Sequence, residues 1–176
     1  MIERALLNVE LPDVAKKMVV QRLMNLFADT FDVEAPCIKH VPYERGLWAF
    51  REFSAVCIEE ALADAAYARA KAAELERNAL DLGSKLRAIV RPADDALVDF
   101  VSWGYRIIGI EVTGSIPGEL VFSRCYFAER YVPAVCALMS AFDSGMVCGF
   151  SGCDRLMFST RITQGCDLCR AAVQPV

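Results

Sequence analysis

The spacing of apolar residues predicts a helix near the start of the chain. Five apolar side chains recur at i, i+3, i+4, i+7 and i+11, the spacing of one helix face: Val20, Leu23, Met24, Phe27 and Phe31. Pro12 suits the first turn of this helix. A connector over residues 32–45 follows, with Pro36, Pro42, Cys37 and the single histidine, His40.

Two more helices are expected before residue 106, where the apolar pattern changes to that of strands. Residues 47–82 are rich in Ala, Glu, Leu and Arg and contain no Pro or Gly, which predicts one long helix. Gly83 is expected to end or kink it. A short helix over residues 94–103 begins with two carboxylates, which complement the positive end of a helix.

From residue 106 the apolar period becomes that of strands. Ile108, Ile110 and Val112 alternate with other residues, and a Gly/Pro-rich turn at 114–118 leads to a second alternating run ending at Arg124. Pro133 predicts the start of a helix that runs to Phe142 and ends at Ser144 and Gly145. Residues 156–162 and 169–173, joined by a turn at 165, predict another strand pair.

Helices followed by strand pairs indicate an α+β fold, with the helices packed on one face of an antiparallel sheet. The 176 residues suit a single domain, mainly helical over 1–104 and carrying the sheet and one helix over 105–176.

The composition of the chain limits the classes of partner that we expect it to bind. The net charge is −4 and the basic residues are spread evenly, which argues against nucleic-acid binding. Mean hydropathy is +0.31 without a run of 18 apolar residues, so we expect no transmembrane helix but an apolar face buried in a homodimer. The first residues include Glu3 and no sustained apolar segment, so no signal peptide is expected. We therefore expect a cytoplasmic protein with reduced thiols.

Six of the eight cysteines lie between Cys125 and Cys169, and four interpretations compete: thiol enzyme, metal site, disulfide scaffold and core packing. Cys166 and Cys169 form a Cys-x-x-Cys pair. The nearest second pair, Cys148 and Cys153, has the looser spacing of a zinc site, so structural zinc stays an alternative. A thioredoxin-like site would need a helix after Cys169, where none is predicted. No cofactor is expected.

Several residues suggest catalysis, each with an ordinary alternative. Cys125 follows Arg124, whose charge would favour a thiolate nucleophile, although a small apolar side chain in the sheet explains it as well. Asp143 closes an apolar helix, where desolvation would suit a general acid or base, unless it simply turns to water. Arg155 and Arg161 share strand parity and so one sheet face, where they would bind a carboxylate or merely face solvent.

The last third of the chain resembles the L-2-amino-thiazoline-4-carboxylic acid hydrolase family. The resemblance rests on the order of short motifs over residues 106–173: Arg124-Cys125-Tyr126, Glu129, Asp143 at a helix end, an Arg-containing strand at 156–162, and Gly-x-Asp-x-Cys at 165–169. In that family a Cys often lies three residues before the Asp, where this chain has Ser140. An Asp-Phe commonly follows the last Cys, where it has Arg170-Ala171. A second, weaker resemblance is to vinyl-reductase-like small-molecule-binding domains.

The resemblance implies a hydrolase that opens a small cyclic amidine bearing a carboxylate. Cys125 would be the nucleophile and Asp143 the general acid/base. The carboxylate would be held by Arg124 or Arg161, and the pocket would be lined by Asp167 and Cys169. The alternatives are a non-catalytic sensor that binds a small molecule or metal, and a structural subunit that dimerises through the long helix.

Overall fold

The computed structural model describes residues 10–175. Its α-helices are α1 (Asp13–Phe31), α2 (Tyr43–Ala61), α3 (Ala65–Val90), α4 (Leu97–Arg106) and α5 (Pro133–Ser151). Its strands are β1 (Ile110–Gly114), β2 (Gly118–Cys125), β3 (Arg155–Thr160) and β4 (Cys169–Gln174). Three 3₁₀ turns connect them: η2 (Asp94–Ala96), η3 (Tyr126–Glu129) and η4 (Ile162–Gln164).

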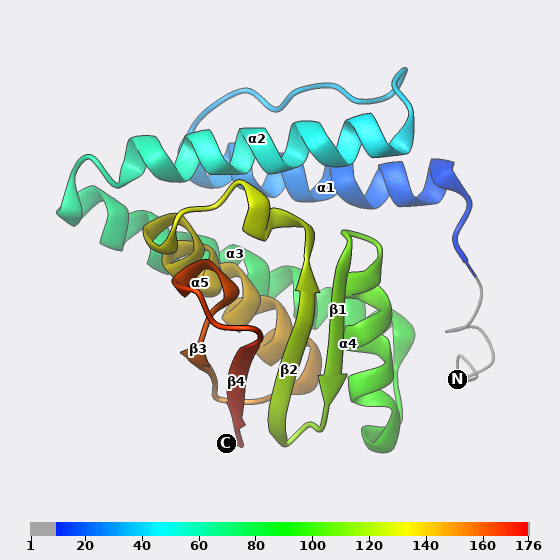
Figure 1. Cartoon of the computed structure of the whole chain (residues 1–176). Coiled ribbons are helices and arrows are strands. Elements are labelled where there is room, and N and C mark those ends of the chain that lie inside the picture. Colours follow the sequence, from blue (N-terminus) through cyan, green and yellow to red (C-terminus); the bar gives the residue numbers. More distant parts are fainter. Residues whose placement is uncertain (1–9, 176) are drawn as a thin grey trace.

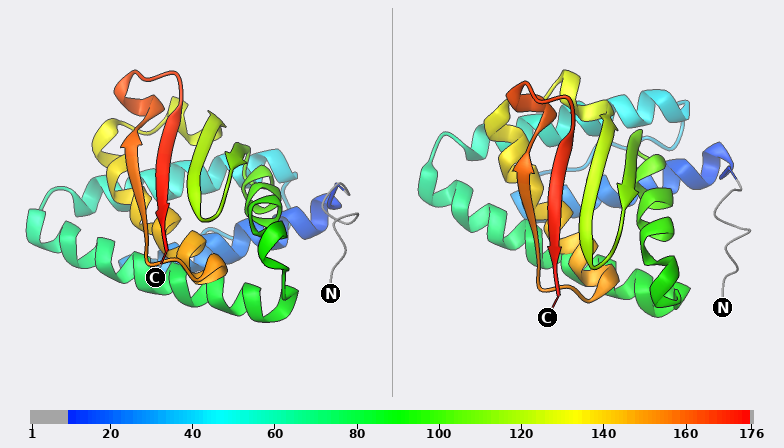
Figure 2. Two further views of the ribbon diagram at one scale, coloured as in Figure 1. Left: turned by 90° about the horizontal axis from the view of Figure 1, so that it is seen from below. Right: turned by 60° about the horizontal axis from the view of Figure 1, so that its bottom comes forward.

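The strands form one antiparallel sheet in the order β1-β2-β4-β3 (Figure 1). Helix α5 lies behind this sheet and packs against α3, while α1 and α2 run side by side across one end (Figure 1). Helix α4 lies beside β1 at the edge of the sheet (Figure 2). The predicted α+β architecture, with helices on one face of an antiparallel sheet, is confirmed.

The predicted apolar face of α1 forms the centre of the core. Val20, Met24 and Phe27 have no exposed surface. The Phe27 ring lies 5.5 Å from that of Phe50 on α2 and 5.8 Å from that of Phe142 on α5. Helices from both halves of the sequence therefore share a single core.

The single long helix predicted over residues 47–82 is wrong, because the chain breaks it into α2 and α3. Asp64 has an extended backbone, and its Oδ1 accepts bonds from the amides of Ala66 and Tyr67 at 2.7 and 3.1 Å. An aspartate at this position satisfies amides that a new helix start leaves without partners. Residues 62–64 thus reverse the chain despite high helix propensity on both sides.

Gly83 does not end the helix, since α3 continues through it to Val90. It lies instead against the backbone of α5, where an added Cβ would come within 2.5 Å of the Met146 carbonyl oxygen. Gly145 and Gly149 on α5 lie equally close to the backbone of α3, because a Cβ on either would lie 2.2 Å from a carbonyl oxygen of that helix. These three glycines let the two helices cross at close range.

Helix α5 is longer than the sequence predicted, because it continues through its crossing with α3. The helix does not stop at Phe142 but continues through Ser144 and Gly145 to Ser151. Asp143 is therefore an interior residue of the helix. It does not close the helix as the sequence predicted.

Two strand boundaries differ from those predicted. Ile107 and Ile108 belong to the turn after α4, and β1 begins only at Ile110. Strand β3 ends at Thr160 after a register shift, so Arg161 does not keep strand parity with Arg155. Arg155 is exposed, whereas Arg161 turns towards α5, which makes the prediction of a shared face wrong.

One helix, α5, is long and apolar enough to span a membrane by length and composition alone, although the sequence was expected to hold none. Half of its apolar stretch is buried within the fold, which is equally typical of a core helix. The segment used to predict the absence of a signal peptide, residues 1–8, lies outside the described residues.

Candidate functional site

The sheet topology brings several predicted site residues to one edge. Strands β2 and β3 are both antiparallel to β4, so they end where β4 begins. Cys125 ends β2, Arg161 follows β3, and Cys169 starts β4. Helix α5 passes behind this edge (Figure 1) and carries Asp143 near its middle. We call Tyr105, Cys125, Cys136, Asp143, Arg161 and Cys169 the acid cluster.

Asp143 is the centre of the acid cluster. Its Oδ1 accepts a 2.7 Å hydrogen bond from the Tyr105 hydroxyl on α4. Protein surrounds the carboxyl group, yet part of the residue stays accessible. Burial raises the pKa of Asp143 from 3.8 to about 6, and the Tyr105 bond and the charge of Arg161 offset only part of that rise. Asp143 therefore exchanges its proton close to neutral pH, as a general acid or base must.

Three thiols surround this carboxyl group, and all are held in their protonated form. Burial raises the pKa of Cys125 from 9.0 to about 12, and the negative charge of Asp143 adds to the rise. Burial also raises the pKa of Cys136 and of Cys169, again with a contribution from Asp143. This environment therefore does not stabilise Cys125 as a thiolate, which was the predicted form of the nucleophile.

Arg124 does not contribute to that environment. Its side chain is 77% exposed and lies 3.9 Å from Glu111 on the neighbouring strand. The pairing of β1 with β2 shifts register between Phe122 and Arg124, which interrupts the alternation of β2. Arg124 is therefore exposed, while Cys125 is partly buried and lies near Asp143 on α5. The expectation that Arg124 lowers the thiol pKa is wrong.

Arg161 supplies the positive charge instead. Its Nε and Nη2 donate to the Ser140 hydroxyl at 3.3 and 3.1 Å, and its guanidinium lies 5.1 Å from the centre of the Phe158 ring. Its charge lowers the pKa of Asp143, Cys136 and Cys169 against the effect of burial. Arg161 thus lies beside the acid and the thiols, and its role as a carboxylate anchor stays a prediction.

Other polar groups next to the acid cluster could not be recognised in the sequence. Tyr131 and Ser54 share a buried 2.6 Å hydrogen bond between α2 and the segment before α5. The buried Thr163 hydroxyl has no hydrogen-bond partner among the described residues, and the Cys136 thiol lies against it. Tyr105 was missed because it lies on a helix 38 residues away from its acceptor. Cys136 had a usable signal, since it lies seven residues before Asp143 on the same helix face.

Of the remaining predicted site residues, Cys169 lies in the acid cluster and Asp167 does not, and the predicted zinc ligands do not come together. Cys169 is buried within the cluster, whereas Asp167 is exposed. Cys148 and Cys153 form a disulfide at the other end of α5, so they do not meet Cys166 and Cys169, and the expectation of reduced thiols is wrong for them. Across residues 10–175, no three His, Cys, Asp or Glu side chains gather as a metal site would require.

A cavity of about 350 Å³ lies on the other side of Tyr105, between α1, α3, α4 and α5. Tyr105 and Phe142 line it, but Asp143 and the three thiols of the acid cluster do not. The molecule therefore separates a polar cluster at the sheet edge from an apolar cavity among the helices.

Comparison of the chain with family models, with curated proteins and with solved structures finds no match. The resemblance to the thiazoline carboxylate hydrolases accordingly stays a prediction.

Proposed function

We propose that the protein is a hydrolase that opens a C–N bond of a small cyclic amidine bearing a carboxylate, such as a thiazoline carboxylate. The observation that carries the proposal is Asp143, a partly exposed residue whose enclosed carboxyl group has a pKa raised to about 6 beside a guanidinium. A raised carboxyl pKa of this kind is a recurring property of catalytic acids and bases.

The chemistry follows from the order of groups around Asp143. Arg161 keeps guanidinium N–H groups beyond its bond to Ser140 and would bind the substrate carboxylate. The Asp143 carboxylate takes a proton from water while the water oxygen bonds to the amidine carbon. When the C–N bond breaks, the Asp143 acid returns that proton to the departing nitrogen. Tyr105 positions Asp143 through its hydrogen bond.

Water is the attacking group in this scheme because the thiols are poor nucleophiles at rest. Cys125, with a pKa of about 12, is almost wholly protonated at neutral pH. Its role as nucleophile therefore stays a prediction. Within the proposal it lines the site together with Cys169.

The test compares three single variants on a 2-amino-thiazoline-4-carboxylate substrate. Asp143→Asn should lower kcat by at least about 100-fold, the usual contribution of general acid/base catalysis. Arg161→Gln should mainly raise KM, and Cys125→Ala should keep most of the turnover. Unchanged turnover in Asp143→Asn would contradict the proposal, and inactivity of Cys125→Ala alone would return the nucleophile to Cys125.

A second candidate function is a binding module without turnover, which the cavity of about 350 Å³ favours. Such a module would bind a small molecule and release it unchanged. Recovery of intact ligand after prolonged incubation with purified protein would support this function over hydrolysis.

A further inference from the structure

We propose that the cavity between α1, α3, α4 and α5 is a binding site for a linear alkyl carboxylate, with Arg22 holding the carboxylate at the mouth. This site is separate from the acid cluster, and its test does not depend on turnover.

The lining of the cavity selects an apolar ligand. Its walls come from α1, α3, α4 and α5, and include Leu23, Phe100, Trp103 and Met146. Tyr105 also lines the cavity, but its hydroxyl is already bonded to Asp143. A polar ligand would therefore lose its hydrogen bonds to water without replacement, whereas an alkyl chain loses none. The volume of about 350 Å³ falls within the range of small-molecule sites.

Gly104 on α4 keeps this space open. A Cβ added at this position would meet no atom within 4 Å, and the backbone there is ordinary helix. Any larger side chain at 104 would project into the cavity without straining the helix. An empty apolar cavity lowers stability, so filling it with a ligand is favourable.

The mouth carries one positive group suited to an anion. Arg22, the charged residue of the lining, is exposed and makes no ion pair or hydrogen bond within residues 10–175. Asp29 and Asp81 line a neighbouring groove with Arg22, but Asp81 is paired with Lys85. Met18, which is 70% exposed, borders the same opening. An apolar interior with a free guanidinium at its entrance matches a chain that ends in a carboxylate.

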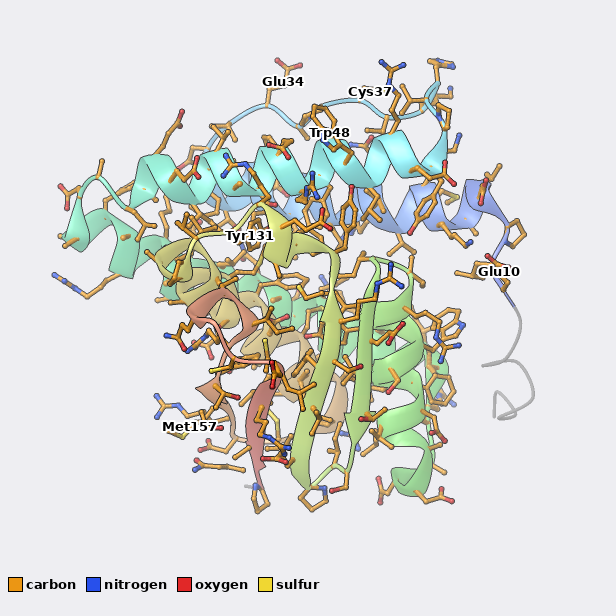
Figure 3. All side chains as sticks on the ribbon, viewed as in Figure 1. Glu10, Glu34, Cys37, Trp48, Tyr131 and Met157 are labelled. Carbon is orange, nitrogen blue, oxygen red and sulfur yellow. A yellow bond between two sulfur atoms is a disulfide. The ribbon has the colours of Figure 1, made fainter. Side chains whose placement is uncertain are left out.

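The two tryptophans provide a direct readout. Trp103 lines the cavity, whereas Trp48 lies on the outer side of α2 and is 52% exposed (Figure 3). In a Trp48→Phe background, a bromine-labelled twelve-carbon carboxylate should quench the Trp103 fluorescence in a saturable manner. Absence of saturable quenching would overturn the proposal.

Two further variants of the Trp48→Phe protein distinguish binding of the alkyl chain in the cavity from binding of the carboxylate by Arg22. Gly104→Leu should abolish the quenching while circular dichroism and the urea midpoint show a folded protein. Arg22→Gln should weaken carboxylate binding by about 10-fold and leave binding of the matching bromo-alcohol unchanged. Full quenching in Gly104→Leu would overturn the site, and equal weakening of acid and alcohol would overturn the anchor.

The quenching experiment also distinguishes two other possible occupants of the cavity, residues 1–9 of the chain and a second copy of the protein. If quenching appears only after residues 1–9 are deleted, this segment of the chain fills the cavity. If binding only accompanies dissociation of a dimer in light scattering, a second copy covers it. Either result would overturn the proposal of a free alkyl carboxylate site.

Discussion

Asp143 illustrates how the surroundings of a single residue set its chemistry. The sequence places it on an apolar helix, but burial against the sheet edge and the bond from Tyr105 define its protonation. A carboxyl group whose pKa is higher in the folded than in the unfolded protein binds extra protons on folding, so its ionisation opposes the fold. This effect can be measured apart from any activity.

The contribution of Asp143 to stability is expected to fall as the pH rises from about 4 to about 6, because its folded pKa is about 6 against an ordinary 3.8. The loss is on the order of 3 kcal/mol as an upper bound, and it persists at higher pH. Asp143→Asn removes it, so this variant should be the more stable protein at pH 7.5. Urea unfolding at pH 4.5 and 7.5 measures both effects.

The matched control is Asp167→Asn, at an exposed position. It should keep the pH dependence of the parent protein. If Asp143→Asn keeps it too, Asp143 is not the group that titrates.

The same pKa predicts the pH dependence of the proposed reaction. Because the base form of Asp143 is needed to accept the proton from water, kcat/KM should rise with pH and level off above about 6. A pH profile of kcat/KM checks this. A flat profile between pH 5 and 7.5 would be inconsistent with Asp143 as the base.

At the scale of elements, the crossing of α3 and α5 depends on the absence of side chains at three positions. Gly83, Gly145 and Gly149 each place backbone against backbone. Propensity alone treats a glycine as a weak point of a helix. In this pair of helices the glycines allow the close approach that carries α5 behind the sheet and Asp143 to its edge.

Gly145→Ala should destabilise the protein by about 3 kcal/mol, because the new Cβ would lie 2.2 Å from the Glu76 carbonyl oxygen and must push the helices apart. Gly104→Ala is the contrasting variant, since its Cβ meets no atom within 4 Å. It should stabilise the protein by roughly 0.5 to 1 kcal/mol. Urea denaturation distinguishes the two, and a loss of stability in both would contradict this account of the crossing.

The disulfide between Cys148 and Cys153 closes a short loop from the end of α5 to the start of β3. Replacing both cysteines by serine should lower the free energy of unfolding by about 2 kcal/mol, the value for so small a loop. Titration of the unfolded, unreduced protein should find six free thiols. Cys37→Ser, at an exposed free thiol, is the control and should leave stability unchanged. Eight titratable thiols would show that the bond does not form.

At the scale of the molecule, the helical side and the open side of the sheet present different surfaces. Met157 points from β3 away from the helices and is 46% exposed, among polar neighbours (Figure 3). On the outer face of α2, Trp48 and Val56 are 52% and 44% exposed. Apolar side chains gathered on one exposed helix face are typical of an interface between subunits.

The predicted homodimer therefore has a specific form, in which α2 of two copies pack together. Light scattering should give twice the chain mass of 19.5 kDa. Trp48→Arg should give a single chain mass with an unchanged circular dichroism spectrum. A monomeric parent protein at micromolar concentration would remove the prediction.

Local patterns were sufficient for much of this fold. The 3.6-residue period of α1, the alternation along β2 and β4, and the order of helices before strands are all visible in the sequence and predicted the α+β architecture. Residue type, motif order and the family resemblance also singled out Asp143, Cys125, Cys169 and Arg161, which the fold brings to one edge of the sheet. These features depend on neighbours within a few positions, or on the simple rule that adjacent strands pair.

Only the tertiary structure decided the remaining features, because each depends on residues far apart in the chain. Gly145 continues a helix that propensity would end, because it lies against α3, and a register shift turns Arg161 away from Arg155. The cap at Asp64 is the exception, since it binds amides only two and three residues away and was outweighed by the high helix propensity on both sides. The protonation of Asp143 and Cys125 is set mainly by burial, and at Asp143 also by the bond from Tyr105; neither effect can be recognised from neighbouring residues in the sequence. The sequence by itself determined the elements and the reactive groups, while packing determined how far α5 continues and which charges those groups carry.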